Sequence, residues 1–280
     1  MVQTVSDLKE LRHLRCSLAG PVGFVPTMGF LHAGHLALVQ AARRDCQSVV
    51  VSIFVNPTQF GPQEDLSRYP RDLPRDLALL DEAGVDLVWL PTAEVMYPPG
   101  YQTWVTVDEV SQPLEGARRP GHFRGVATVV AKLFHAVQPD RAYFGQKDAQ
   151  QAVIIRKMTE DLNMPVRVKV MPTIREKDGL AMSSRNRYLS SQERKEAVLL
   201  FASLKKAKQL IEAKETSASR IVRLMRAVIQ KAPHARIDYV QVVDPDTLQP
   251  LTKINRRCLI VLAVRIGKTR LIDNLMVNRR

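Results

Sequence analysis

The chain lacks any uninterrupted apolar run of roughly 18 residues, the length that a membrane-spanning helix needs. Its N-terminal segment also lacks the continuous apolar stretch of a secretory signal. Cysteine is scarce, with only Cys16, Cys46 and Cys258, and no CxxC spacing occurs. This pattern disfavours a disulfide framework or a structural zinc site and favours reduced thiols. We therefore expect a cytoplasmic protein without a membrane partner.

The positive charge is confined to one part of the chain. Lys plus Arg and Asp plus Glu balance at 18 and 18 over residues 1–174, whereas residues 175–280 contain 23 and 10 and supply the whole net charge of +13. A basic segment of this kind is suited to nucleic-acid phosphates, to an anionic membrane surface, or to a polyphosphate bound by a near-neutral domain. The charge count alone leaves these three open.

The length of 280 residues corresponds to about two domains. Short β-branched runs alternate with segments of helical apolar spacing over the first 174 residues, which predicts a parallel sheet covered by helices on both faces. The predicted strands are Val22–Pro26, Ser48–Val55, Leu87–Pro91, Arg141–Gly145 and Val166–Pro172. In such sheets, ligands bind beyond the carboxyl ends of the strands.

The pattern changes after Gly179. We predict a helix that starts at Ser190–Gln192, a second helix over Ala218–Gln230, and an antiparallel sheet. Its predicted strands are Ile237–Val243, Cys258–Ile266 and Thr269–Ile272, with a tight turn at Gly267 and Lys268. The fold class is therefore α/β with a smaller α+β C-terminal domain, divided as 1–175 and 176–280.

Two histidines follow the first predicted strand in VGFVPTMGFLHAGH. His32 and His35 are three residues apart at a predicted helix N-terminus, so both rings can face one side. The helix dipole, free backbone amides and the small Gly34 there suit the phosphates of a nucleotide. A single histidine is more often a structural residue, which is how we interpret His13, His135 and His234.

The sequence AYFGQKDAQQ places Gly145, Lys147 and Asp148 where the Arg141–Gly145 strand ends. Lys147 is suited to phosphate and Asp148 to ribose hydroxyls. Asp148 and Gln151 also have the spacing of a helix cap, and this alternative stays open.

A third segment, TIREKDGLAMSSRNRYLSS, contains Ser183, Ser184 and Arg185. Their hydroxyls, amides and guanidinium match the needs of a triphosphate clamp, although an ordinary polar linker has similar composition.

Two further segments offer neutral amides beside apolar walls. FVNPTQF contains Asn56 and Gln59, and RRPGHFRGVATVV contains Arg119 and His122 followed by a valine stripe. Such groups suit a small hydroxylated acid. The valines alone are better explained as core. Asp72 and Asp76 have a spacing compatible with Mg²⁺ binding, but carboxylates near a helix start are commonly solvated charges.

Together these motifs resemble the pantoate-beta-alanine ligase family of the HxGH nucleotidyltransferase superfamily. The matching segments are PTMGFLHAGH (26–35), FVNPTQF (54–60), RRPGHFRGV (118–126), FGQKDAQQ (144–151), LAMSSRNRYLS (180–190) and GKTRLIDN (267–274). The HxGH motif alone is weak, because other nucleotidyltransferases and class I aminoacyl-tRNA synthetases share it. The occurrence of all six in order along the chain is specific.

The resemblance implies a Rossmann-type catalytic domain, a C-terminal lid domain and a homodimer. It implies ATP with Mg²⁺ as co-substrate, no tightly bound prosthetic group, and an acyl-adenylate route from pantoate and beta-alanine to pantothenate. It implies His35, His32, Lys147 and Arg185 as catalytic residues. The implied ATP-binding residues are Met28, Gly29, Phe30, Leu31, His32, Ala33, Gly34, His35, Gly145, Gln146, Lys147, Asp148, Ile174, Met182, Ser183, Ser184 and Arg185. The implied pantoate-binding residues are Gln59, Gln151, Val129 and Val130, with Gln59 also binding beta-alanine. The residues that would contact Mg²⁺ are not assigned.

Ala33, Gln146 and Ile174 depart from the residues frequent in the family, but none of these changes removes a reacting group. The absence of a GxSxG elbow agrees with a route that needs no protein nucleophile. Two alternatives are another HxGH-type nucleotidyltransferase, including a tRNA-synthetase-like adenylating enzyme, and a noncatalytic nucleotide-binding protein. Against a nucleic-acid partner, aromatic residues make up only 6% of the chain, too few to indicate a base-stacking platform.

Overall fold

The protein, seen in a computed structural model that describes residues 2–62 and 64–279, contains two compact units. The first comprises the chain up to Gly145 together with Gln150–Pro172. The second comprises Gln146–Ala149 and the chain from Thr173 onward. The chain thus enters the second unit twice, which a single boundary near residue 175 does not describe. The catalytic and lid roles of these parts stay predictions.

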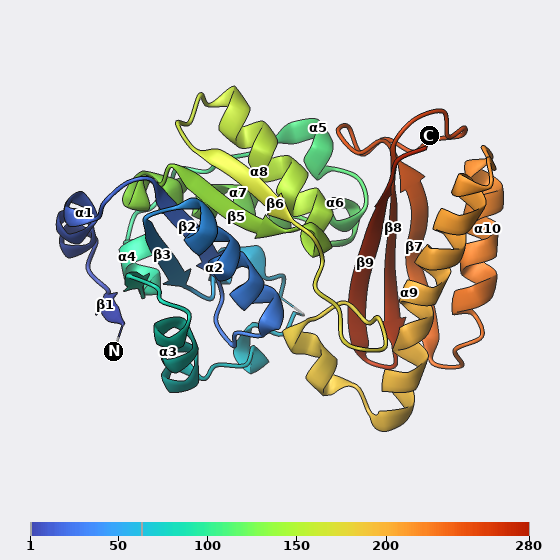
Figure 1. The fold of residues 1–280 in the computed structure, drawn as a ribbon, viewed down its shortest axis with the longest axis horizontal. Helices are drawn as coiled ribbons and strands as arrows, with labels where there is room; N and C mark the ends of the chain where they lie inside the picture. Colours follow the sequence, from blue (N-terminus) through green and yellow to red (C-terminus); the bar gives the residue numbers. More distant parts are fainter. Residues whose placement is uncertain (1, 63, 280) are drawn as a thin grey trace. The chain divides into compact units, whose positions relative to one another are not determined.

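The first unit is built on a six-stranded parallel sheet with the order β1-β4-β3-β2-β5-β6 (Figure 1). Its strands are β1 (Gln3–Val5), β2 (Val22–Thr27), β3 (Ser48–Ile53), β4 (Leu87–Trp89), β5 (Arg141–Gly145) and β6 (Arg167–Met171). All pairs in the sheet are parallel, which confirms the predicted fold class. Of these strands the sequence pattern missed β1, because three residues are too few to show alternation.

Helices cover both faces of this sheet. On one face, α1 (Leu8–Ser17), α7 (His122–Val137) and α8 (Ala149–Asp161) enclose a core that includes Phe24, Phe134 and Ile154. On the other, α2 (Ala33–Asp45) and α3 (Leu73–Glu82) pack Val39 and Leu80 over the strands. Each fully buried aliphatic or aromatic side chain stabilises the unit by roughly 1.5–3 kcal/mol. The remaining short helices of this unit are η1 (Pro57–Gln59), η2 (Leu66–Arg68), α4 (Ala93–Met96), α5 (Asp108–Ser111) and α6 (Glu115–Arg118). The short helix η3 (Gln146–Asp148) follows β5 but belongs to the second unit.

The strand order places a topological switch point between β2 and β5. From β2 the chain continues to β3 on one side, while β5 and β6 lie on the other side of β2. In open parallel sheets the ligand lies outside the carboxyl ends of the strands at such a point. The histidine segment begins directly after β2, and the lysine-bearing turn η3 begins directly after β5.

The second unit is a three-stranded antiparallel sheet with two helices packed on it (Figure 1). Besides η3, its elements are η4 (Ser184–Tyr188), α9 (Ser191–Glu212), α10 (Ala218–Ile229), β7 (Ala235–Val243), β8 (Cys258–Ile266) and β9 (Thr269–Val277). Ser190 caps α9 together with Glu193, which confirms the predicted helix start. β9 runs five residues beyond its predicted end at Ile272, because the buried polar Asp273 and Asn274 interrupt the apolar pattern without interrupting the pairing with β8.

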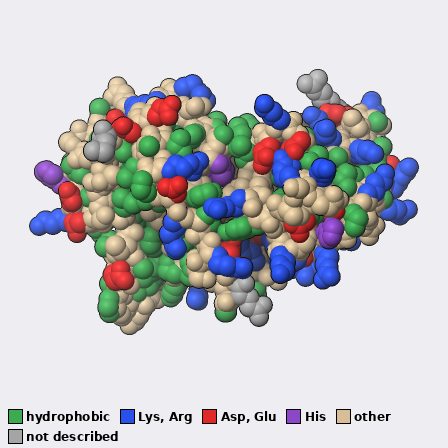
Figure 2. All heavy atoms as spheres, turned by 90° about the horizontal axis from the view of Figure 1, so that it is seen from below, with side chains coloured by type: hydrophobic (Ala, Val, Ile, Leu, Met, Phe, Trp, Pro, Cys, Tyr) green, Lys and Arg blue, Asp and Glu red, His purple; other side chains and the backbone are tan. Residues whose placement is uncertain are grey.

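Lys and Arg side chains are spread over the visible surface of the second unit (Figure 2). Within residues 2–62 and 64–279, no helix is both long enough and apolar enough to cross a bilayer.

Candidate active site

The loop between β2 and α2 lies tightly against its neighbours. Gly29 has a φ of +80°, and a Cβ added there would lie 3.0 Å from Ile53 Cγ2 and 3.1 Å from Asp76 Oδ2. Glycine meets both demands, since it tolerates positive φ and needs no space for a side chain. The glycine of the TMGF segment therefore lets the backbone before His32 pass close to β3 and α3.

The side chain of Asp76 fixes this loop by bonding to the loop's backbone amides. The Asp76 carboxylate accepts hydrogen bonds from Phe30 N at 2.6 Å and from Leu31 N at 2.8 Å, and the residue is 1% exposed. Burial raises the pKa of the Asp76 carboxyl, although the two amide donors oppose this effect. The expectation that Asp76 is a solvated helix-start charge is wrong: Asp72 caps α3, and the next helical turn directs Asp76 at the loop amides.

His32 and His35 open α2 with their rings stacked at a centroid distance of 4.0 Å, which confirms that both face one side. His32 is the N-cap residue, and its Nδ1 accepts from Gly34 N at 3.1 Å. His35 Nδ1 accepts from His32 N at 3.3 Å. A ring nitrogen that accepts carries no proton, so each neutral imidazole carries its proton on Nε2. The helix start thus sets both rings as Nε2–H donors.

Gln59 is held at the end of η1 by the buried amide of Asn56. Asn56 Nδ2 donates to Gln59 Oε1 at 3.1 Å and to Gly125 O at 3.2 Å. Gln59 Nε2 lies 3.2 Å from Met28 Sδ, which places this side chain beside the histidine loop. Gly125 lets α7 approach, since a Cβ there would lie 2.4 Å from Thr58 O. The first unit therefore brings Gln59 and the segment after β2 together.

His122 and Arg119 support the same turn from α7 and the residues just before it. His122 Nδ1 lies 2.8 Å from Gln59 O, and Arg119 Nη1 lies 3.0 Å from His122 Nε2. The carbonyl requires a donor and the guanidinium requires an acceptor, so the ring is neutral with its proton on Nδ1. Burial and the charge of Arg119 lower the pKa of His122 to about 4. Arg119 also pairs with Glu64 at 2.6 Å.

Val129 and Val130 lie in α7 with 5% and 4% exposure and belong to the hydrophobic core of the first unit. Gln151 lies in the first turn of α8, partly buried. Their assignment to pantoate stays a proposal.

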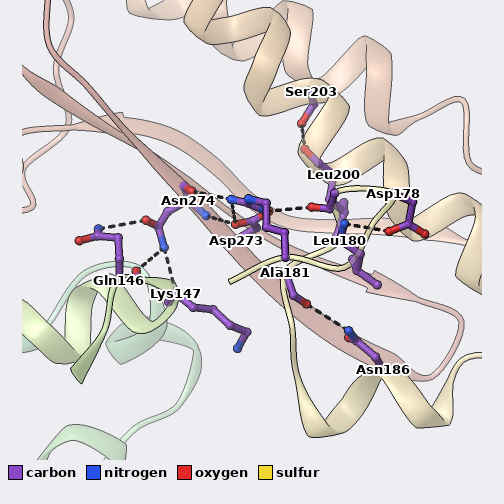
Figure 3. A network of polar contacts seen from close by, with 12 residues as sticks. Gln146, Lys147, Asp178, Leu180, Ala181, Asn186, Leu200, Ser203, Asp273 and Asn274 are labelled. Atoms are coloured by element: carbon purple, nitrogen blue, oxygen red, sulfur yellow. Dashed lines mark hydrogen bonds and ion pairs between the residues drawn. The ribbon is translucent and has the colours of Figure 1, made fainter. Parts of the chain in front are cut away.

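In the second unit, the turn η3 presents Lys147 with its side chain 21% exposed and Nζ 3.8 Å from Asp148 Oδ1. Dashed lines in Figure 3 mark the hydrogen bonds that tie this turn to Asn274 of β9. Gln146 is bonded to the same residue through its side chain.

The segment that contains the proposed triphosphate loop folds back on itself. Met182 N donates to Ile174 O at 3.0 Å, so two of the implied ATP-binding residues lie side by side. Ser183 caps η4 by accepting from Arg185 N at 3.3 Å. Asn186 Nδ2 secures the segment by donating to Ala181 O at 3.1 Å (Figure 3).

The base of this segment is held by charge. Arg194 pairs with Glu176 at 2.6 Å and with Asp178 at 2.7 Å. Arg175 donates to both carboxylate oxygens of Asp273, at 2.6 and 2.9 Å. The sequence alone did not predict these ion pairs, although Asp273 lies in the segment GKTRLIDN. The signal that could have revealed it is the pair of polar residues, Asp273 and Asn274, inside an otherwise largely apolar strand.

The comparisons with known proteins agree with one another. A family model described as pantoate-beta-alanine ligase matches residues 1–276. A pantothenate synthetase of Herpetosiphon aurantiacus is 57% identical over 277 residues, covering 99% of this chain and all of that protein. One from Fervidobacterium nodosum is 56% identical over 278 residues, covering 99% of each.

Solved structures show the same similarity. Pantothenate synthetase from Thermus thermophilus superposes with a TM-score of 0.94 at 51% identity, covering 98% of this chain and 99% of that one. A pantoate-beta-alanine ligase from Francisella tularensis, described as complexed with beta-gamma ATP and beta-alanine, has a TM-score of 0.80 at 33% identity, with 99% and 98% covered.

Proposed function

Because the chain belongs to the pantoate-beta-alanine ligase family, we propose that it joins pantoate to beta-alanine at the expense of ATP, through a pantoyl adenylate. The observation that carries this proposal is 57% identity to a pantothenate synthetase over 99% of the chain. The resemblance of the six segments to this family is thereby confirmed. A tRNA-synthetase-like or other nucleotidyltransferase function is not favoured by these matches.

The reaction has two steps. In the first, a carboxylate oxygen of pantoate attacks the α-phosphorus of MgATP; an O–P bond forms, and the α–β bridging bond breaks with its electron pair leaving on pyrophosphate. In the second, the free amine of beta-alanine attacks the acyl carbon. A C–N bond forms, the bond to AMP breaks, and the amine proton is lost to solution. Neither step needs a covalent bond to the protein.

The catalytic residues act on charge and position. His32 and His35 donate from Nε2 to the transferring phosphate, since their Nδ1 atoms are occupied by backbone amides. Lys147 and Arg185 supply positive charge to the phosphates. Preorganised donors of this kind are the largest single contribution in many enzymes, worth about 3–4 kcal/mol each.

ATP binding uses three segments in this proposal. The first is 28–35, where Met28, Gly29, Phe30, Leu31, Ala33 and Gly34 surround His32 and His35. The second is 145–148, where Gly145, Gln146 and Asp148 flank Lys147. The third contains Ile174, Met182, Ser183 and Ser184, next to Arg185. Supporting this assignment, Asp76 holds the first segment and Asn274 the second. The convergence of all three on one triphosphate stays a prediction.

Pantoate binds through Gln59 and Gln151, with Val129 and Val130 as apolar contacts, and Gln59 also binds beta-alanine. The fixed amide of Gln59 supports this role, because Asn56 and Met28 leave it one orientation. Mg²⁺ enters with ATP as substrate, and no prosthetic group is part of the proposal. We also propose that the protein is a cytoplasmic homodimer of the coenzyme A pathway and that residues 176–280 form a lid.

The test is direct. ATP, magnesium, (R)-pantoate and beta-alanine are incubated with the protein, and AMP and pantothenate are the expected products. Omitting beta-alanine should leave pantoate-dependent exchange of labelled pyrophosphate into ATP. Pyrophosphate exchange at the same rate with and without pantoate would contradict the proposal. ATP consumption that depends on tRNA would support a tRNA-synthetase-like enzyme instead.

A further inference from the structure

The lysine-bearing turn belongs to the second unit although it directly follows a strand of the first. Gln146–Ala149 groups with the chain from Thr173 onward. Asn274 of β9 anchors it: Asn274 Nδ2 donates to Gln146 O and to Lys147 O, both at 2.9 Å (Figure 3). Asn274 Oδ1 accepts from Gln146 Nε2 at 3.1 Å.

The anchor is itself rigid. Asn274 is 4% exposed and pairs with Val261 in the antiparallel sheet. Its backbone N–H donates to Asp273 Oδ1 at 2.8 Å, and Asp273 in turn accepts two hydrogen bonds from the Arg175 guanidinium. A packed strand with a buried bidentate pair is a fixed reference for the turn.

The Asn274 amide uses its N–H groups on two consecutive carbonyls and its oxygen on the side chain of Gln146. Neither aspartate nor leucine reproduces this set, because aspartate presents oxygen to carbonyl oxygen and leucine presents no polar atom. Since the two carbonyls lie on either side of the Lys147 Cα, their hydrogen bonds fix the direction in which the Lys147 side chain leaves the turn.

We propose that Asn274 is a positioning residue for Lys147, which makes β9 of the second unit the element that aims the phosphate-binding lysine. The proposal rests on the proposed function, in which Lys147 acts on the phosphates of ATP. Asn274 touches the lysine turn and not the reacting atoms. It bonds both Gln146 and Lys147, but of these two only Lys147 carries a charge, so its main effect on catalysis passes through Lys147.

The test is a double-variant cycle on the full-length protein, measured as pantoate-dependent pyrophosphate exchange. Asn274→Asp should lower kcat/KM for ATP roughly 10- to 100-fold, the loss expected from misplacing a catalytic group by about 1 Å. In a Lys147→Ala background, Asn274→Asp should change kcat/KM less than about 2-fold, because the residue through which it acts is gone. KM for pantoate should be unchanged.

Asp238→Asn is the matched control. Asp238 lies on β7 of the same sheet and pairs with Arg270 at 2.7 Å. The substitution is of the same size and breaks polar contacts in the same unit, but it leaves the turn untouched, so kcat/KM should stay near that of the unaltered protein. Melting temperatures of all variants are measured in parallel.

The outcomes separate the claims. Multiplicative losses in the double variant, or near-normal kcat/KM in Asn274→Asp, overturn the positioning role. Near-normal exchange in Lys147→Ala alone defeats the proposed role of the lysine, and no exchange in the unaltered protein defeats the proposed function. If Asn274→Asp does not fold, Asn274→Ser, which keeps one donor, replaces it in the same cycle and must show the same non-additivity.

Discussion

Each unit uses one buried carboxylate to hold a functional segment, but the two carboxylates have different partners. Asp76 in the first unit, 1% exposed, accepts hydrogen bonds from two neutral backbone amides of the histidine loop. Asp273 in the second unit, 3% exposed, accepts hydrogen bonds from the charged guanidinium of Arg175, beside the lysine turn. Asp76 thus holds its segment mainly through backbone dipoles, with Arg75 Nη1 farther away at 3.9 Å, whereas Asp273 holds its segment through a short ion pair. Equivalent substitutions at these two carboxylates should therefore have unequal costs.

The largest expected effect is on the second unit. Asp273→Asn keeps the shape of the side chain but leaves the mostly buried Arg175 without its counter-charge. Breaking a buried pair in this way costs about 3–5 kcal/mol of unfolding free energy. Urea denaturation of the variant measures it, and a loss below that of Asp76→Asn would reverse the comparison between the units.

Next is a pair of catalytic variants, one from each unit. His35→Ala and Lys147→Ala should each slow pantoate-dependent pyrophosphate exchange roughly 10²- to 10³-fold, as removal of one charge-stabilising donor does. The residues His13 and Lys206, which lie outside the proposed site, provide His→Ala and Lys→Ala controls that should retain activity. Near-normal exchange in either catalytic variant would remove that unit's segment from the proposed site.

The third prediction concerns pH and His122. Its folded pKa of about 4 lies below the ordinary 6.5, so the neutral ring stabilises the fold. This contribution is present above pH 6.5 and is lost as pH falls toward 4, with a limit of roughly 3 kcal/mol. The unfolding free energy of His122→Gln, compared with that of the unaltered protein from pH 4 to 8, should show the deficit shrinking with acid. A deficit that grows with acid would mean a charged ring.

The fourth prediction, with a smaller expected loss of stability, is for Asp76→Asn. The amide oxygen can accept from one loop N–H, while its NH₂ faces the other, so one buried donor loses its partner. The expected cost is about 1–3 kcal/mol of unfolding free energy. Exchange activity should fall as well, because Phe30 and Leu31 lead into the histidines. Unchanged stability and activity would show that the loop does not depend on this carboxylate.

The smallest effect should come from His234, which has the opposite sign to His122. The hydrogen bond to Glu196, at 2.8 Å, raises the pKa of His234 above 6.5. Its contribution is therefore present below pH 6.5 and lost as pH rises through the raised value. The His234 side chain is 53% exposed, so solvent screens the pair and the effect is small. The unfolding free energies of His234→Gln and the unaltered protein, compared across pH 5 to 9, measure it. A deficit that grows as pH rises would contradict the assignment.

Local patterns in the sequence predicted most of the fold. The bounds of β5 and β8 agree with prediction to the residue, since both are largely apolar runs with clear ends. Prediction failed where a polar residue is buried by a distant partner. Asp76 accepts from a loop amide 45 residues away, and Asn274 donates to a turn carbonyl 127 residues away, and no local pattern reports such pairings.

The candidate site shows the same limit. The spacing of His32 and His35 was sufficient to predict that they share a side, because a helix start sets that geometry locally. The side chain of Gln59 is held by a local partner, Asn56. His122 of α7 and Asn274 of β9, which bond the backbones of Gln59 and Lys147, are distant in sequence, and tertiary packing alone selects them.

The double entry of the chain into the second unit means that the polypeptide has no point near its midpoint where one cut would separate two self-sufficient pieces. Cleavage after Pro172 would leave the lysine turn on the N-terminal fragment and its Asn274 anchor on the C-terminal one. Two co-expressed halves would therefore be active only after Gln146–Ala149 of one fragment had bound non-covalently to the second unit in the other fragment. Fusion, permutation or fragment designs should keep residues 146–280 in one covalent piece.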